Sequence, residues 1–265
     1  MNGTPAARRS GRPASGEPVL ARAFRLLGAF DRAGEALSLA TLARRAGLPK
    51  SSTLRLASQL VEEGALERSE DGAYVVGLRL LEVAALAPRG HGLRSAALPH
   101  LEDLHQVTRQ HVLLAVRDDD QAVLVERLSA LDATPVRHRV GGRLPLGATG
   151  VGLALLAFAP AGLQEAVIAS APGDAAARRR VRQLVASVRT QGVVSVTTAN
   201  PVADGPAWIT TVAAPILLNR VDAVGAISLV SPTRGALVGQ RLALRTTSMA
   251  IARAYAASAS RGARP

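Results

Sequence analysis

The chain of 265 residues contains no cysteine, only 2% aromatic residues and no long apolar run. The absence of thiols excludes disulfide bonds and thiolate metal sites. No stretch reaches the roughly 18 uncharged apolar residues of a membrane-spanning helix. Arg8, Arg9 and Arg12 are not followed by the apolar segment of a signal peptide. We therefore expect a cytoplasmic protein that does not contact a membrane.

Hydrophobic residues nevertheless make up 48% of the chain, so alanine, leucine and valine must fill its cores. A chain of this length usually forms two domains. The net charge of +12 is typical of proteins with a nucleic-acid partner. Residues 1–87 hold 12 basic and 9 acidic side chains, so most of the excess of basic residues lies after residue 87. The charge can steer the protein to DNA, but it does not locate the DNA-binding domain.

Residues 38–49 predict a short helix and a tight turn. Apolar side chains recur at helical spacing from Leu39 to Ala46, and Ser38 stands where a cap is needed. Gly47 can adopt the left-handed conformation that ends a helix, and Pro49 suits the first turn of the next one. We therefore expect two helices joined at Gly47.

The second helix, from Pro49 to about Glu63, has one apolar and one polar face. Its polar face begins with Lys50-Ser51-Ser52 and continues to Arg55. Residues 65–76 follow as two short apolar runs around Asp71-Gly72, which predicts a hairpin. Helix, turn, helix and hairpin is the order of a winged helix-turn-helix. The alternative is a small helical domain whose polar face is only solvated.

The candidate DNA contacts are mostly on that polar face. Donors between Lys50 and Arg55 suit phosphates and base edges in a major groove, and Arg68 in the hairpin would hold a phosphate. Arg22 on the preceding helix is either a further phosphate ligand or an ordinary surface arginine. The residues that we assign to double-stranded DNA are Arg22, Thr41, Lys50, Ser51, Ser52, Leu54, Arg55 and Arg68.

The first thirty residues contain a tail and a helix. Gly11-Arg12-Pro13 is similar to part of a minor-groove hook, although a flexible tail is the favoured interpretation. In the helix from Val19 to Phe30, the side chains at 20, 23, 24 and 27 share a face that would close a three-helix core. A proline and glycine break at 87–90 marks the boundary to the second domain.

The second half alternates between helical and strand patterns, which predicts an α+β domain on a mostly antiparallel sheet. Strands are expected at 112–116, 122–128, 136–140, 193–198, 209–215 and 224–229. Helices are expected at 93–110, 151–158, 163–170, 175–191 and 234–257. The expected divisions are a tail at 1–17, a winged helix-turn-helix at 18–77, a linker helix at 78–92, an effector and oligomerisation domain at 93–258 and a tail at 259–265.

The glycine-rich segment before residue 151 is a candidate ligand site. Gly147 to Gly150 opens a helix whose free N–H groups attract anions, and Arg143 would add a fixed charge. The alternative is a helix start capped by Thr149 or by water. The residues show no nucleophile elbow, phosphate-binding loop or Ser/His/Asp set, and His100, His105 and His111 are not spaced as metal ligands on one helix face. We expect no enzyme activity, metal or cofactor.

Several segments together resemble the IclR family of bacterial transcription regulators: 39–56, 64–68, 77–81, 143–149 with Gly152, 155–157 and 212–216. The resemblance covers roughly residues 18 to 255. It implies a homodimer or homotetramer that binds DNA, with a dimer contact on the first helix and a GAF-like α/β effector domain. It also implies an effector pocket, to which we assign Arg143, Leu146, Gly147, Ala148, Thr149, Trp208, Thr211 and Ser228.

Three pocket positions depart from the family pattern. Relatives often carry a cysteine or small polar residue at Thr211, an acidic residue near Ala199 and Asn200, and a histidine at Gly147. These departures change which ligands leave no buried group unpaired. The effector is therefore a carboxylate of the usual kind or a more apolar metabolite. The remaining alternative is a closed pocket in a domain that serves only assembly.

Overall fold

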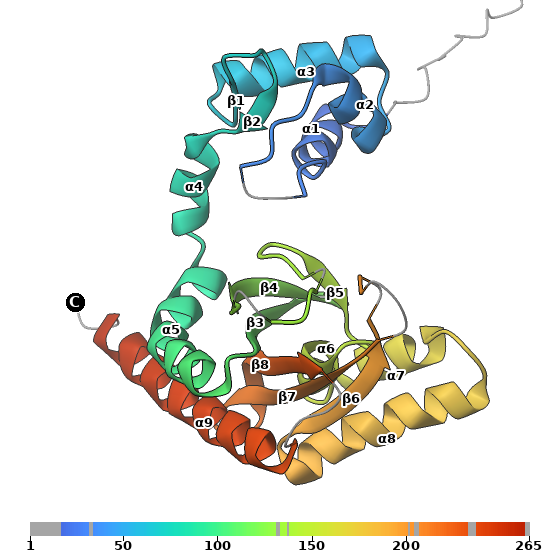
Figure 1. The fold of residues 1–265 in the computed structure, drawn as a ribbon, viewed down its shortest axis with the longest axis vertical. Helices are drawn as coiled ribbons and strands as arrows, with labels where there is room; N and C mark the ends of the chain where they lie inside the picture. The colour runs from blue at the N-terminus through green and yellow to red at the C-terminus, as the bar shows by residue number, and fades with distance from the viewer. Residues whose placement is uncertain are drawn as a thin grey trace, which may run out of the picture. The chain divides into compact units, whose positions relative to one another are not determined.

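The computed structural model describes residues 17–31, 34–130, 133–136, 138–200, 202–203, 207–232 and 237–262 (Figure 1). The chain divides into two compact units, residues 1–86 and residues 87–265. Within the described ranges, every helix is too short or too polar to cross a lipid bilayer.

The first unit is a winged helix-turn-helix, as the sequence predicts. Three helices precede a hairpin whose register pairs Leu66 with Val76, and a fourth helix follows. The elements are α1 (Val19–Leu27), α2 (Leu39–Ala46), α3 (Lys50–Glu62), β1 (Leu66–Arg68), β2 (Tyr74–Val76) and α4 (Leu78–Ala85).

The turn between α2 and α3 has the expected local causes. The hydroxyl of Ser38 accepts a hydrogen bond from the Thr41 N–H at 3.3 Å and so caps α2. Gly47 ends α2 with φ of 61°, in the left-handed region. Pro49 precedes the first residue of α3. The apolar face of α3 lies in the core, where Thr53 and Leu56 are buried.

The predicted core face of α1 is confirmed only in part: Leu27 packs against the core, but two other residues of that face do not. Leu20 and Phe24 are 70% and 73% exposed, whereas Leu26 is fully buried. The helix ends at Leu27, and the next residues, Ala29 and Phe30, are buried in the same core as Leu26. Ala29 and Phe30 thus contribute to the core, whereas Leu20 and Phe24 leave an apolar surface on α1.

The second unit is an α+β fold built on one antiparallel sheet with the strand order β5-β4-β3-β8-β7-β6. Its helices are α5 (Pro88–Thr108), α6 (Gly150–Leu156), α7 (Ala161–Ser170), α8 (Ala175–Gln191) and α9 (Leu237–Gly262). Its strands are β3 (His111–Asp118), β4 (Gln121–Leu128), β5 (Arg143–Pro145), β6 (Val194–Ala199), β7 (Trp208–Leu218) and β8 (Asp222–Pro232).

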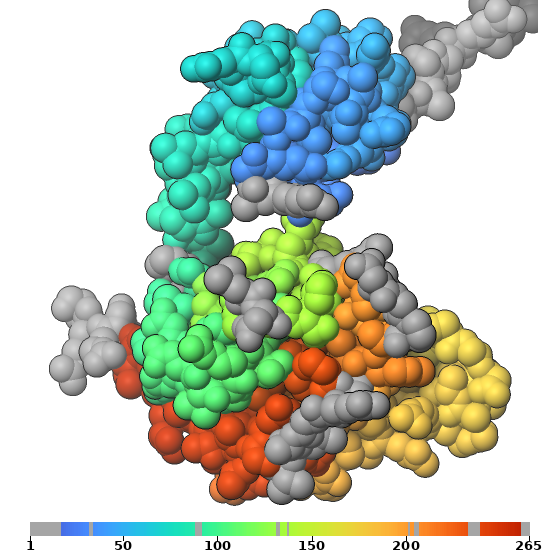
Figure 2. Space-filling model, viewed as in Figure 1, coloured from blue at the N-terminus to red at the C-terminus, as the bar shows by residue number. Residues whose placement is uncertain are grey.

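Two hydrophobic clusters cover the two faces of this sheet. α5 and α9 lie side by side on one face (Figures 1 and 2), and α6 and α8 pack on the other. Residues of β8 alternate between the clusters: Ala226 and Val230 pack with α6, whereas Ile227 and Leu229 pack with α5 and α9. The sheet is thus buried on both sides.

Several element boundaries differ from the prediction by a few residues, and the structure contains a short strand, β5, that was not predicted. The expected strand at 136–140 is absent from the described residues of that segment, because the Gly142 N–H bonds the Arg139 carbonyl in a turn and the chain joins β4 only from Gly141 onward. Helix α5 begins at Pro88 rather than Leu93, since proline fits the first position of a helix. The expected start of the last helix, Arg234, lies outside the described residues.

Candidate functional site

The exposed face of α3 presents donors that the protein itself does not use. Lys50, Ser51 and Arg55 are exposed and Ser52 is half-buried. Within the described ranges, neither Lys50 nor Arg55 has a hydrogen bond or an ion pair from its side chain. Leu54, which is 44% exposed, adds an apolar group to this face. The face can therefore bind both polar and methyl groups of a partner.

The beginning of α3 favours an anion. Pro49 has no side chain that can cap the helix, and the N–H groups of a first turn have no partner within the helix. A helix N-terminus also carries a partial positive charge. Lys50, Ser51 and these N–H groups together match the chemistry of a phosphate.

The other residues predicted to contact DNA differ in how far their side chains are already bonded within the protein. Arg68 donates to the Tyr74 hydroxyl at 2.8 Å, and its guanidinium carbon lies 4.9 Å from the centre of that ring, so the hairpin fixes its direction. Arg22 is half-buried and its Nε has no partner in the described chain. The Thr41 hydroxyl accepts from the Ser38 hydroxyl at 3.1 Å. Arg44, exposed in the last turn of α2, was not predicted from the sequence.

A cavity of about 230 Å³ lies in the second unit between the sheet and the start of α6. Its walls are mostly apolar, with few polar groups. The apolar side chains include Leu113, Leu144, Val151, Val196, Ile209 and Val230. The polar ones are His138, Thr149, Thr198, Thr211 and Ser228. An apolar hollow with a few polar groups is the usual form of a small-molecule site.

The structure brings four of the predicted effector residues to this cavity: Ala148, Thr149, Thr211 and Ser228. Arg143 and Trp208 are not among its lining residues. In each strand the next residue, Leu144 or Ile209, faces the cavity instead, because side chains alternate between the faces of a sheet. Arg143 pairs with Asp118 at 2.6 Å, and Trp208 is 59% exposed.

Leu146 and Gly147 also lie outside the cavity lining. Leu146 is buried in the cluster below α6, and both residues border a separate shallow hollow that also includes Val167. The helix start itself is capped: Thr149 accepts from the Gly152 N–H at 3.2 Å and donates to the Pro145 carbonyl at 2.9 Å. The structure thus shows the Thr149 cap that the sequence left open as the alternative to an anion site.

Two polar residues of the cavity, Thr198 and His138, were not predicted. Thr198 could have been found from the alternation of β6, since Val196 lies two residues before it and faces the same way. His138 has no local signal, because it lies in an irregular loop. Its place depends on contacts far apart in the sequence, such as the bond from the Asn200 side chain to the Pro135 carbonyl at 3.0 Å.

A neutral histidine anchors the same loop. His111 is buried on β3; its Nε2 contacts the Thr134 carbonyl, and its Nδ1 lies 2.7 Å from the Ser129 hydroxyl. Burial lowers the pKa of His111, although the hydrogen bond to the Thr134 carbonyl acts in the opposite direction. Burial also lowers the pKa of His138, and the positive charge of Arg127 adds a smaller decrease. Both rings are therefore neutral at pH 7.

Acid should destabilise the second unit. A histidine whose folded pKa is depressed binds fewer protons than the unfolded chain, so its contribution to stability falls as the pH drops below about 6.5. For His111 the slope is up to about 1.4 kcal/mol per pH unit. We expect the melting temperature to fall between pH 7.5 and 5.5, and the dependence to flatten in His111→Asn but not in the control His100→Gln. A wild-type melting temperature that does not change over this range would contradict the prediction.

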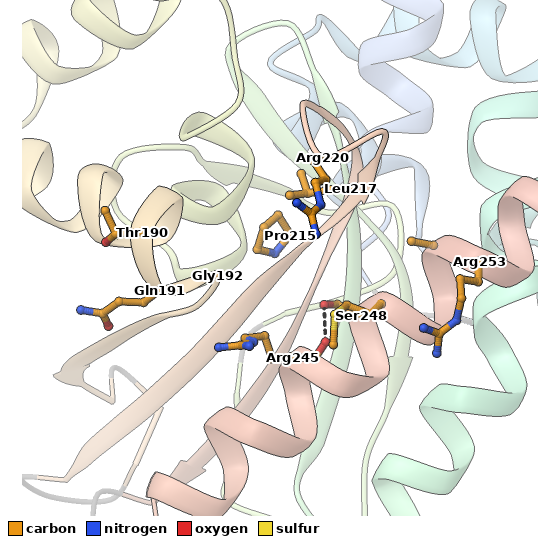
Figure 3. A pocket seen from close by; sticks show the side chains of 11 residues that line it. Thr190, Gln191, Gly192, Pro215, Leu217, Arg220, Arg245, Ser248 and Arg253 are labelled. Carbon is orange, nitrogen blue, oxygen red and sulfur yellow. Dashed lines mark hydrogen bonds between the residues drawn. The ribbon is translucent and has the colours of Figure 1, made fainter.

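A second hollow, of about 460 Å³, lies by the last turn of α8, the turn between β7 and β8, and α9 (Figure 3). It is lined by Arg220, Arg245 and Arg253 above an apolar floor that includes Pro215 and Met249. The three arginines are exposed to solvent, where a guanidinium is well hydrated. None of the predicted effector residues lines this hollow.

A winged helix-turn-helix followed by an α/β unit with a largely apolar cavity is the architecture of a class of DNA-binding regulator. The model of the IclR helix-turn-helix domain matches residues 19–70, and that of the bacterial transcriptional regulator IclR C-terminal domain matches residues 86–260. The chain belongs to the IclR family of transcription regulators, which is not a family of enzymes.

Known relatives agree with this assignment. The regulator KipR of Bacillus subtilis is 34% identical over 124 residues, which are 47% of this chain and 50% of KipR. The repressor AllR of Escherichia coli is 31% identical over 56% of this chain and 58% of AllR. The chain thus aligns with little more than half of the length of these curated relatives.

Solved structures match over more of the chain. An IclR homologue from Microbacterium hydrocarbonoxydans, crystallised with 4-hydroxybenzoate, is 33% identical, has a TM-score of 0.78 and covers 91% of this chain and all of its own. The IclR of Thermotoga maritima, at 21% identity and a TM-score of 0.65, shares the fold over 88% of this chain and 97% of its own. The predicted fold class is confirmed.

Proposed function

We propose that the protein binds operator DNA through α3 and that a small molecule in the α6 cavity changes this affinity. The observation that carries the proposal is the exposed face of α3, where Lys50 and Arg55 have no side-chain partner in the described chain. Such unused donors beside an uncapped helix start match the chemistry of a DNA groove. We place this activity in the cytoplasm, with the DNA.

The roles of individual residues follow from their positions. Arg55 faces base edges, and Ser51 and Ser52 lie beside it with short donors. Lys50, at the first turn, neutralises a phosphate. Leu54 is suited to a thymine methyl group. Arg68, held by Tyr74 in the wing, contacts the backbone, as do Arg22 and Thr41 at the edge of the unit.

A second copy of the chain is proposed to cover the apolar surface of α1. Leu20 and Phe24 are largely exposed there, and Leu78 and Leu81 on α4 are 63% and 65% exposed. Apolar surface of this kind is typical of an interface. A dimer would present two copies of α3 to half-sites about 34 Å apart, or a multiple of this distance. The assembly is therefore a homodimer, or a homotetramer made of two such dimers.

The cavity supports an effector and argues against a domain that serves only assembly. It is open space of about 230 Å³ rather than a closed core. The Microbacterium homologue was crystallised with the small molecule 4-hydroxybenzoate. A ligand changes DNA affinity only if it favours one arrangement of the two DNA-binding units over the other. Repression and activation are both compatible with this scheme.

Selection of DNA from a random library with the full chain tests the proposal. We expect an enriched inverted repeat that binds an even number of chains in sedimentation. A specific site should bind at least about a thousandfold more tightly than random DNA at the same salt concentration. Enrichment of no common sequence, or one chain per bound site, would count against the proposed function.

A further inference from the structure

We infer that the α6 cavity takes an uncharged, ring-sized molecule with a hydroxyl or carbonyl group that pairs with the hydroxyl of Ser228. This inference rests on the proposed function, because it names the class of effector at the proposed site. It goes beyond the choice between a carboxylate and a more apolar metabolite, since it specifies both the charge and the polar group. Three features of the cavity carry it.

The first feature is an unpaired hydroxyl. Ser228 is fully buried in the middle of β8 and lines the cavity, and its Oγ has no hydrogen-bond partner in the described chain. A buried hydroxyl without a partner costs free energy in the folded state. A ligand that offers an acceptor or a donor at this point recovers that cost. The position of Ser228 is therefore better explained by binding than by folding.

The second feature is that the described lining residues carry no charge. Among the described lining residues none is Asp, Glu, Lys or Arg, and the pKa of His138 is lowered by burial, so its ring is neutral. Two arginines of neighbouring strands, Arg127 and Arg143, are engaged elsewhere. Arg127 donates to the carbonyl of His138 and, at 2.8 Å, to the Ser129 hydroxyl. Arg143 pairs with Asp118. A carboxylate would lose its hydration here without gaining a side-chain counter-ion.

The third feature is size. A cavity of about 150 Å³ lined by aliphatic and aromatic side chains accommodates benzene. The cavity below α6 measures about 230 Å³, so it has room for a six-membered ring and a small substituent. Leucine, valine and isoleucine side chains supply its walls, and these pack against the faces of a ring without offering it charge.

A pair of matched compounds tests whether the cavity prefers an uncharged ligand. Calorimetric titration of the full chain with 4-hydroxybenzamide and with 4-hydroxybenzoate compares nearly equal sizes and the same hydroxyl, with and without a negative charge. We expect the amide to bind at least about tenfold more tightly. Equal or tighter binding of the benzoate overturns the inference, and so does the absence of binding by the amide, phenol, benzyl alcohol and benzamide.

The operator affinity is measured separately with and without the amide. If the amide binds and operator affinity does not change, the ligand class stands and the proposed regulation fails. If the benzoate binds preferentially and changes operator affinity, the regulation stands and the ligand class fails. The two proposals can therefore be contradicted independently.

The variant Ser228→Ala tests the polar group. Removal of an unpaired buried hydroxyl should raise the melting temperature of the free protein, while affinity for the amide falls at least about fivefold. In the control Thr210→Val, the lost hydroxyl is on β7 and bonds Thr197 at 2.9 Å, so stability should fall and amide affinity should stay within twofold. Unchanged amide affinity in Ser228→Ala, or a lower melting temperature of its free form, overturns the assignment of Ser228.

Discussion

Replacement of Arg55 by alanine should weaken operator binding by about 10- to 100-fold and binding to random DNA by no more than about twofold. The side chain is exposed on α3 and has no partner in the described chain, so its removal leaves the fold intact. A bidentate contact from arginine to guanine contributes about 1–3 kcal/mol of discrimination against the wrong base. A phosphate contact, in contrast, weakens all sequences alike.

Fluorescence anisotropy with the selected operator and with a scrambled duplex, at one salt concentration, measures both affinities. Arg179→Ala is the matched control, because Arg179 is exposed on α8 and its loss changes the net charge equally. The control should leave the ratio of the two affinities unchanged. If Arg55→Ala weakens both DNAs by the same factor, Arg55 contacts the backbone and does not read bases.

Gly77→Ala should unfold the DNA-binding unit at a much lower temperature. A Cβ at position 77 would lie 2.1 Å from the carbonyl oxygen of Gly64 and 2.9 Å from its carbonyl carbon. Both are backbone atoms at the end of α3, which cannot rotate away as a side chain can. We expect a loss of at least about 3 kcal/mol, the upper end of the usual cost of overpacking. For a unit of this size the melting temperature should fall by more than about 12 °C.

Differential scanning calorimetry of the full chain, together with operator binding, measures this effect. Gly162→Ala in α7 is the matched control, because among the described residues no atom beyond its chain neighbours and the backbone of its own helix lies within 4 Å of the position its Cβ would take. Alanine is a better helix former than glycine, so this control should gain up to about 1 kcal/mol. If Gly77→Ala melts within 2 °C of the wild type, the close approach at Gly64 does not exist in solution.

The helix-turn-helix was predictable because each of its boundaries has a local cause. The Ser38 cap and the left-handed turn at Gly47 each act over a few residues, so they are visible in the sequence. The orientation of α1 was not predictable in this way, because it depends on Ala29 and Phe30, which are buried in the core after the helix has ended. An exposed apolar residue such as Phe24 also looks like a core residue when only the periodicity is known.

The cavity was only partly predictable for a different reason. In a strand, an error of one position moves a side chain to the opposite face of the sheet. Arg143 and Trp208 do not line the cavity, but each stands next to a strand residue that does, Leu144 or Ile209. His138 was missed because its loop is placed by long-range bonds, including those of His111 and Asn200. Such contacts leave no periodic pattern in the sequence.

Strand β8 has a consequence for how a bound molecule is sensed. Ser228 borders the cavity, whereas its neighbours Ile227 and Leu229 pack against the cluster that contains Leu93 of α5. Only one layer of backbone therefore separates an occupant of the cavity from the helix that directly follows the DNA-binding unit in the chain. A displacement of that backbone would move Ile227 and Leu229, whose side chains share a cluster with Leu93 of α5.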